Sequence, residues 1–133
     1  KAQTFDGIVV GTGNKVEDFG VGFYTKYGDG GVDISPIADL YKSEVWEMAR
    51  ELSIDQRIID AKPTDGLWDD GRVDEDQLNG MGYKELEECM KLVEAQDVYD
   101  VLEEDEVAKV DKYNEIRSRN LHKMNPIPMF LKS

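Results

Sequence analysis

The most suggestive polar residues lie in a loop that follows a short apolar run. Residues 11–14 read Gly-Thr-Gly-Asn, and Glu17 comes five residues after Thr12. The glycines let backbone N–H groups approach a nucleotide, and the Thr12 hydroxyl can hydrogen-bond to it. A Mg²⁺ ion held together with phosphates needs only one or two carboxylates, so Glu17 alone would suffice. The alternatives are an ordinary strand-to-loop turn for the glycines and a solvated surface acid for Glu17.

A second loop, residues 23–33 (FYTKYGDGGVD), has three glycines within four positions. Such backbone freedom has an entropic cost that a purely structural loop seldom needs. The flanking aromatic rings can stack on other rings, and Lys26 can neutralise phosphate. Asp29 and Asp33 can accept hydrogen bonds from ribose or from ammonium. The alternative is a flexible connector.

Single polar residues elsewhere complete the set of candidates. Lys42 lies on the flank of a predicted apolar stripe, where it can direct one positive charge at a phosphate or be solvated. Thr64 offers a loop hydroxyl with the same two interpretations. His122 and Lys123 come at the end of a predicted helix, where the helix dipole alone would favour cations. The histidine has no evident nucleophile partner, so the sequence predicts no Ser–His–Asp triad.

One strand and several helices must position these residues. Residues 7–11 (GIVVG) are predicted to form a central parallel strand buried on both faces. Ser35 as N-cap and Pro36 as first residue predict a helix that ends near Ser53. Further helices are predicted over 55–61, 83–94 and 106–121, and the loop 62–82 is predicted to contain one turn at 74–78. The apolar stripe of the first helix comprises Ile37, Leu40, Tyr41, Val45, Met48 and Leu52.

The predicted strand has no partner on either edge. Parallel strands pair through crossover connections, and we find no second strand in the sequence. We therefore expect the missing strands to come from elsewhere. On this interpretation residues 1–133 are the C-terminal portion of a larger α/β domain.

Composition excludes several classes of protein. The chain has 133 residues, with 16 Lys and Arg against 29 Asp and Glu, and a net charge of −13. Residues 112–133 hold five basic residues and one acid, a net of +4, which leaves −17 for the rest. This balance argues against nucleic acid as a partner, and no apolar run approaches the roughly 20 residues of a membrane span. Only the C-terminal segment is suited to an anionic ligand.

The single cysteine, Cys89, bears on the compartment and on reactivity. One cysteine cannot form an internal disulfide or a zinc site, which favours a reducing, cytoplasmic environment. Its position among acids in a predicted helix raises the pKa of the thiol, so we expect an inert side chain.

Four blocks of sequence stand out in chain order: GTGNKVE (11–17), FYTKYGDGGVDISPIADLYKSEV (23–45), AKPTDGLWDDGRVDEDQLNG (61–80) and HKMNPIP (122–128). Together these blocks resemble the NAD synthetases, which are N-type ATP pyrophosphatases. The resemblance implies a Rossmann-like adenine nucleotide alpha hydrolase fold with a parallel sheet, of which this chain has the C-terminal, mostly helical part. It also implies ATP-dependent amidation of deamido-NAD (nicotinic acid adenine dinucleotide) with ammonia, giving NAD, AMP and pyrophosphate through an adenylated intermediate.

The same resemblance implies a role for each candidate residue. Lys42 and Asp29 would be catalytic, with Lys42 on the ATP phosphates and Asp29 receiving or deprotonating ammonium. Glu17 would bind Mg²⁺, the implied cofactor, with ATP as co-substrate. ATP would also contact Thr12 and Thr64, and deamido-NAD would be held by Lys26, Asp33, His122 and Lys123.

The chain departs from the family pattern in ways that matter for activity. The serine- and glycine-rich loop of the form SGGxDS is absent, as is the arginine that the family places before the GTGN strand. Gln77 stands where the family usually has an acid. The resemblance points to the ammonia-using class and to a homodimer, with no nucleic acid or membrane as partner. The alternative is a non-catalytic fragment that keeps a nucleotide-binding or dimerisation surface.

Overall fold

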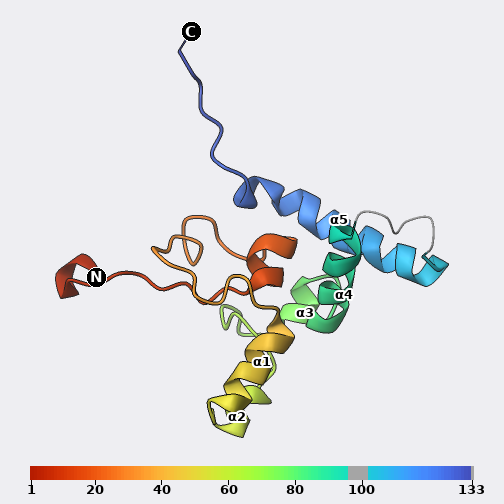
Figure 1. Cartoon of the computed structure of the whole chain (residues 1–133), viewed down its shortest axis with the longest axis horizontal. Helices are drawn as coiled ribbons and strands as arrows, with labels where there is room; N and C mark the ends of the chain where they lie inside the picture. The colour runs from red at the N-terminus through yellow and green to blue at the C-terminus, as the bar shows by residue number, and fades with distance from the viewer. Residues whose placement is uncertain (96–101, 133) are drawn as a thin grey trace.

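The structure is a computed structural model that describes residues 1–95 and 102–132, and it is mostly helical (Figure 1). Within those ranges there is no sheet, and the only β-pairing is an isolated parallel bridge between Val10 and Ile34. The helical elements are η1 (Gln3–Phe5), η2 (Val16–Val21, a π-helix), α1 (Lys42–Glu51), α2 (Gln56–Ile59), α3 (Asp74–Gln77), α4 (Tyr83–Glu94) and α5 (Glu104–Met124).

The centre of the molecule is formed by α4, α5 and η2, which pack against one another. The helix predicted over 83–94 is confirmed as α4, and its apolar positions Tyr83, Leu86 and Met90 are buried. Apolar residues spaced three and four apart form one face of a helix, which explains this burial. The core that α4 shares with its neighbours is Val16, Val21, Leu78, Met81, Leu86, Cys89, Met90, Val110, Tyr113 and Ile116.

Gly22 allows η2 to end directly against α5. Its φ is +65°, in the left-handed region that favours glycine. A Cβ at this position would lie 2.7 Å from the Cβ of Asn120, so a side chain would push the two elements apart. The Asn120 amide donates to the Val21 carbonyl at 3.0 Å, which ties α5 to the end of η2.

The predicted start of the first long helix at Ser35 is wrong, because α1 begins at Lys42. Residues 36–40 form turns instead. The carbonyl of Leu40 accepts a hydrogen bond from the Lys15 N–H in the loop before η2, at 2.8 Å. Tyr41 is extended, and its N–H donates to the Glu44 carboxylate at 2.7 Å, which caps the helix. Turn formation thus outcompetes the capping signal of Ser35 and Pro36.

The expectation of a strand buried on both faces is also wrong. Ile8, Val9 and Val10 are 61%, 43% and 51% exposed. One edge is paired within the chain, since the Gly11 N–H donates to the Ile34 carbonyl at 2.7 Å, so the expectation of no internal partner needs correction. The predicted apolar stripe of the first helix is only partly covered: Tyr41 packs against the core, Met48 and Leu52 are exposed, and no residue of α1 is fully buried. Both segments expose apolar side chains because no described part of the chain covers them.

The remaining predictions agree with the structure to within a few residues. The helix predicted over 55–61 is α2, whose N-cap Asp55 accepts from the Arg57 N–H at 2.9 Å. The turn predicted within the long loop is α3. The last helix is longer than predicted at both ends, and it stops before Pro126. Among the described residues, no helix is long and apolar enough to cross a membrane.

Candidate functional site

A cavity of about 540 Å³ brings together side chains that are far apart in the sequence, and we call it the polar cavity. Its walls come from the loop before η2, the glycine-rich loop 23–31, the start of α1, the loop 63–68, α3 and the end of α5. Six of the nine residues that the sequence singled out line it: Thr12, Glu17, Asp29, Lys42, Thr64 and Lys123.

The other three predicted residues lie elsewhere. Lys26 and His122 line an adjoining hollow of about 510 Å³, which shares Tyr24, Thr25 and Lys123 with the polar cavity. Asp33 lines neither space, because its carboxylate accepts a hydrogen bond from the Val9 N–H at 2.7 Å. The structure therefore brings eight of the nine into one connected region and leaves Asp33 at the β-bridge.

Glu17 is held in place by the turn in which it lies. The Asn14 side-chain oxygen accepts from the N–H groups of Val16 and Glu17, at 3.1 and 3.2 Å. In return, Oε2 of Glu17 accepts from the Asn14 N–H at 3.2 Å. This reciprocal pattern is a capping box, so the spacing from Asn14 to Glu17 has a local structural role. The other oxygen of Glu17, Oε1, is left for contacts on the cavity side.

Two groups contact this second oxygen. The Lys42 ammonium lies 3.2 Å from Oε1 of Glu17, and the side chains of both residues are mostly buried. The Tyr83 hydroxyl lies 2.5 Å from the same oxygen. Lys42 also sits 4.8 Å from the centre of the Tyr83 ring, a cation–π distance. The predicted cation and the predicted acid are therefore partners of each other in this structure.

Tyr83 and Asp74 are site residues that the sequence analysis missed. The Tyr83 hydroxyl is 2.8 Å from Oδ2 of Asp74, and both residues are more than nine-tenths buried. Burial raises the pKa of Tyr83 and, as the largest effect, the pKa of Asp74. The apolar pattern of α4 placed Tyr83 on a buried face, but no sequence signal indicated that its hydroxyl faces two carboxyl groups.

Lys26 and Lys123 connect the glycine-rich loop to the end of α5. Lys123 donates to the carbonyls of Gly22 and Tyr24, at 2.9 and 2.7 Å, and burial lowers the pKa of its ammonium. Lys26 donates to the His122 carbonyl at 2.7 Å, in the last turn of the helix. Cations are favoured at this end of a helix. Both lysines therefore hold backbone in addition to facing the cavities.

Acidic groups gather near the loop before η2. The Asp18 carboxylate packs closely against Gly13, where a side chain would collide with it. Burial, together with the nearby charges of Glu17 and Asp29, raises the pKa of Asp18 to about 6. Asp29 accepts from the Thr25 N–H at 2.7 Å and so helps to shape the glycine-rich loop. Asp18 is a further residue that the sequence did not single out.

The loop over the opposite side of the polar cavity carries Thr64, Leu67 and Trp68. The Thr64 hydroxyl donates to the Arg72 carbonyl at 3.1 Å, which closes the loop on itself. The Arg72 guanidinium lies 4.1 Å from the centre of the Trp68 ring, and Trp68 is still 52% exposed. An exposed aromatic ring at a cavity wall is suited to stacking on a planar ligand.

The residues present fit a Mg²⁺ ion that is shared with phosphates. No group of three or more His, Cys, Asp or Glu in residues 1–95 and 102–132 is arranged to hold a metal. Mg²⁺ bound with phosphates needs only one or two carboxylates. Glu17 supplies one at the cavity wall, and the buried Oδ1 of Asp74, also on that wall, has no hydrogen-bond partner. Glu17 is therefore the residue that would hold the ion.

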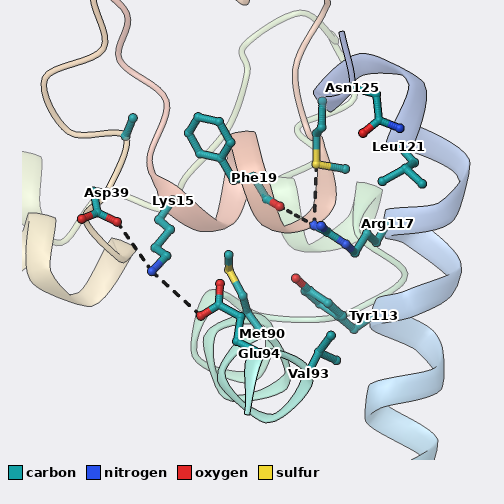
Figure 2. A pocket seen from close by; sticks show the side chains of 12 residues that line it. Lys15, Phe19, Asp39, Met90, Val93, Glu94, Tyr113, Arg117, Leu121 and Asn125 are labelled. Carbon is teal, nitrogen blue, oxygen red and sulfur yellow. Dashed lines mark hydrogen bonds and ion pairs between the residues drawn. The ribbon is translucent and has the colours of Figure 1, made fainter. Parts of the chain in front are cut away.

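A second space of about 580 Å³, the apolar groove, lies between η2, α4 and α5 (Figure 2). Arg117 of α5 donates to the carbonyls of Phe19 and Gly20, and Lys15 lies 3.6 Å from Asp39 and 3.9 Å from Glu94. No predicted site residue lines it. Its lining is Lys15, Phe19, Ala38, Asp39, Met90, Val93, Glu94, Tyr113, Arg117, Leu121, Met124 and Asn125.

The polar cavity has the properties of a site for an anionic ligand that carries a ring. It combines lysine ammonium groups, hydroxyls, a carboxylate suited to a hard cation and an exposed indole. Comparison with known proteins gives the family of the chain. The family model for NAD synthase matches residues 1–127, and the chain belongs to the NAD synthase family.

Relatives of established name extend this result. The chain is 39% identical over 131 residues to the NH(3)-dependent NAD(+) synthetase of Methanosarcina acetivorans, and the match covers 96% of this chain and 50% of the relative. The corresponding protein of Archaeoglobus fulgidus is 44% identical over 126 residues, covering 95% of this chain and 48% of the relative. The chain therefore spans about half the length of the curated relatives it matches.

Solved structures show the same relationship. NMN synthetase from Francisella tularensis superposes with a TM-score of 0.76 at 33% identity, covering 96% of this chain and 48% of that one. The NH3-dependent NAD synthetase from Campylobacter jejuni superposes with a TM-score of 0.68 at 23% identity, covering 98% and 48%. At that identity the second likeness concerns the fold alone.

Proposed function

We propose that this chain is the C-terminal portion of an ammonia-dependent NAD synthetase. The enzyme would amidate deamido-NAD at the expense of ATP, giving NAD, AMP and pyrophosphate. The observation that carries the proposal is the convergence of Thr12, Glu17, Lys42, Thr64 and Lys123 on one cavity, although they span most of the chain. The family to which the chain belongs supports the same reaction.

The chemistry assigns a task to each part of the cavity. In the first step a carboxylate oxygen of the nicotinate attacks the α-phosphorus of ATP, and the bond to pyrophosphate breaks. Negative charge on the phosphates must be stabilised as this happens. Lys42 would supply an ammonium, Thr12 and Thr64 would donate hydroxyl hydrogen bonds, and a Mg²⁺ ion at Glu17 would supply further positive charge.

In the second step ammonia attacks the carbonyl carbon of the adenylate, and the bond to AMP breaks. The attacking nitrogen loses a proton, and Asp29, which lines the cavity wall, would accept it. Lys26, His122 and Lys123 line the adjoining hollow and would hold deamido-NAD. Asp33 would join them only if a ligand drew its carboxylate away from the Val9 N–H.

The fold that we propose for the whole enzyme is the Rossmann-like adenine nucleotide alpha hydrolase fold. The strand segment around Val9 pairs on one edge only and leaves its apolar side chains exposed, as expected where further parallel strands pack. Those strands would bring the SGGxDS loop, so the 133-residue chain alone would be inactive. We place the enzyme in the cytoplasm.

A homodimer also belongs to the proposal. Apolar residues stay exposed on the segment after α5, where Met129, Phe130 and Leu131 are each more than three-quarters exposed. Figure 1 shows that this segment leaves the helical body. A second copy of the chain would cover such residues.

The decisive test has two parts. Sequencing the gene upstream of Lys1 is expected to find an in-frame SGGxDS segment, and a start codon at this point would contradict the proposal. The complete protein is then assayed for amide formation with ATP, ammonium and either deamido-NAD or nicotinic acid mononucleotide. NAD as the main product supports the proposal. NMN as the main product would contradict it and would indicate the activity for which the Francisella protein is named. ATP binding with neither product would instead support a non-catalytic fragment.

A further inference from the structure

The buried Tyr83 hydroxyl contacts two carboxyl groups of the polar cavity's wall, those of Glu17 and Asp74, and core packing alone does not explain this arrangement. We propose that Tyr83 is a positioning residue, which keeps the Glu17 carboxylate directed into the cavity when Lys42 leaves it for the phosphates of ATP. This inference rests on the proposed function, because it concerns the Glu17 carboxylate as the group that holds Mg²⁺ with ATP. It adds Tyr83, and Asp74 in contact with the Tyr83 hydroxyl, to the residues on which the binding of Mg²⁺ with ATP depends.

The first step of the argument is the double contact on Oε1 of Glu17. Lys42 lies 3.2 Å from this oxygen and the Tyr83 hydroxyl lies 2.5 Å from it. A lysine that binds phosphate cannot stay in this place, since its compact ammonium follows the strongest negative charge within reach. When Lys42 leaves, the tyrosine hydroxyl is the remaining donor to that oxygen among the contacts described.

The second step is the rigidity of Tyr83 compared with Lys42. The Tyr83 ring is 8% exposed and packs edge-on against Trp46, with ring centres 6.4 Å apart. A tyrosine has two side-chain torsions and a lysine has four, so a buried ring holds its hydroxyl more firmly than a lysine holds its ammonium. Tyr83 is therefore suited to remain in place while Lys42 changes partner.

The third step is the role of Asp74. Its Oδ2 lies 2.8 Å from the Tyr83 hydroxyl, and its Oδ1 is buried with no hydrogen-bond partner. A buried polar atom without a partner destabilises a fold, so such atoms call for an explanation. Asp74 lines the polar cavity, and since the Tyr83 hydroxyl has a single proton to give to Glu17, Asp74 would donate to the Tyr83 oxygen as a protonated carboxyl. This role would account for a buried carboxyl at that position.

Tyr83→Phe tests the proposal, because it removes one oxygen and keeps the ring that packs against Trp46 and under Lys42. Calorimetric titration with ATP is done with saturating Mg²⁺ and again with a chelator. The expected result is a roughly tenfold loss of ATP affinity with Mg²⁺, the effect of one hydrogen bond to a charged acceptor, and little change without it. Equal losses in both conditions, or no loss with Mg²⁺, would overturn the proposal.

Tyr113→Phe is the matched control. Among the described residues Tyr113 is a second buried tyrosine, and it lines the apolar groove instead of the polar cavity. Its substitution removes a buried hydroxyl at a similar cost in packing, so it should leave ATP affinity unchanged under both conditions. A loss in Tyr113→Phe equal to that in Tyr83→Phe would show a general effect on the fold and would overturn the proposal.

A second measurement needs no nucleotide, and it separates this inference from the proposed function. NMR of Lys42→Ala should show two distinct γ-proton resonances for Glu17, because Tyr83 still fixes the side chain. The double variant with Tyr83→Phe should show a smaller separation between the two resonances, because Oε1 of Glu17 then lacks both described donors and the Asn14 N–H holds only Oε2. If the complete wild-type protein binds no ATP, the proposed function of the cavity fails, and the NMR comparison alone decides whether Tyr83 positions Glu17. Averaged resonances already in Lys42→Ala would refute that role.

Discussion

Arg117 of the apolar groove and Lys42 of the polar cavity have different kinds of partner, although each space also holds a lysine of the other kind: Lys15 pairs with carboxylates in the groove, and Lys123 holds carbonyls in the cavity. In the groove, Arg117 donates to the backbone carbonyls of Phe19 and Gly20. In the cavity, Lys42 contacts the carboxylate of Glu17 and the face of the Tyr83 ring. Backbone carbonyls move only with the fold, whereas a side-chain pair can open when a phosphate offers a better partner. The comparison suggests that Arg117 stabilises the structure and that Lys42 is available to a ligand.

The two spaces also differ in how α4 contributes to them. Its first residue, Tyr83, reaches the cavity network, while Met90 and Val93 near its other end form a wall of the groove. Both ends belong to one short helix with Leu86 fully buried between them. The helix therefore supports a polar site at one end and an apolar surface at the other, and substitutions can affect the two separately.

The largest expected effect is the loss of stability in Arg117→Met. This change keeps an apolar stem in the groove but removes the donors for two carbonyls, one of which belongs to the buried Gly20. We expect a loss of about 2–3 kcal/mol in the free energy of unfolding, measured by urea denaturation, as for hydrogen bonds to a charged group. ATP affinity should stay within experimental error. A variant of normal stability with weakened ATP binding would reverse the proposed roles of the two regions.

The next effect concerns Lys42→Ala, which should lower ATP affinity at least tenfold, corresponding to about 1.4 kcal/mol. Turnover of the complete enzyme should fall by at least the same factor. Lys15→Ala is the control, because Lys15 is a partly buried lysine with acidic partners that lies in the apolar groove. Near-normal ATP binding and turnover in Lys42→Ala would reject the assigned role.

A third prediction tests whether the core that separates the two regions stays closed. Burial, followed by the charges of Glu85 and Glu88, raises the pKa of the Cys89 thiol. A raised pKa leaves less reactive thiolate at any given pH, so alkylation at pH 8 should be about tenfold slower in the folded chain than in urea. The rate should rise with pH through a midpoint above that of the unfolded chain. Equal rates in the two states would show that α4 separates readily from α5.

The smallest expected effect is spectroscopic. Trp68 is half exposed at the wall of the polar cavity, while Trp46 packs against Tyr83. In a Trp46→Phe variant, ATP should change the emission of the remaining indole as the ligand displaces water or Arg72 from its face. The same titration in the reverse variant, Trp68→Phe, should show a smaller change. Emission that does not respond to ATP would place the ligand away from the loop 63–68.

Sequence pattern alone predicted the helices whose apolar faces are covered within the chain. The limits of α4 agree because spacing, capping and burial all favour the same residues. The start of α1 was mispredicted because Ser35 and Pro36 initiate a turn just as readily, and the hydrogen bond from Lys15 to the Leu40 carbonyl favours the turn. The residues around a helix start do not show which N–H group, distant in sequence, will donate a hydrogen bond to one of their carbonyls.

The candidate site divides in the same way. Residue types and the family resemblance singled out Lys42 and Glu17, but only the tertiary structure showed that they contact each other. The structure also added Tyr83 and Asp74, which come from α4 and α3 and have no polar motif around them. Asp33, predicted beside the others, proved to be bound to the strand segment instead.

The sequence by itself thus determined the helical periodicity, the acidic body with its basic end and the set of chemically capable residues. These are properties of composition and of spacing along a helix. The tertiary structure decided which of those residues share a cavity, because α5 brings Lys123 beside a loop about a hundred residues earlier in the chain. Contacts between segments so distant in sequence depend on how the buried faces of η2, α4 and α5 pack, and no local pattern records that packing.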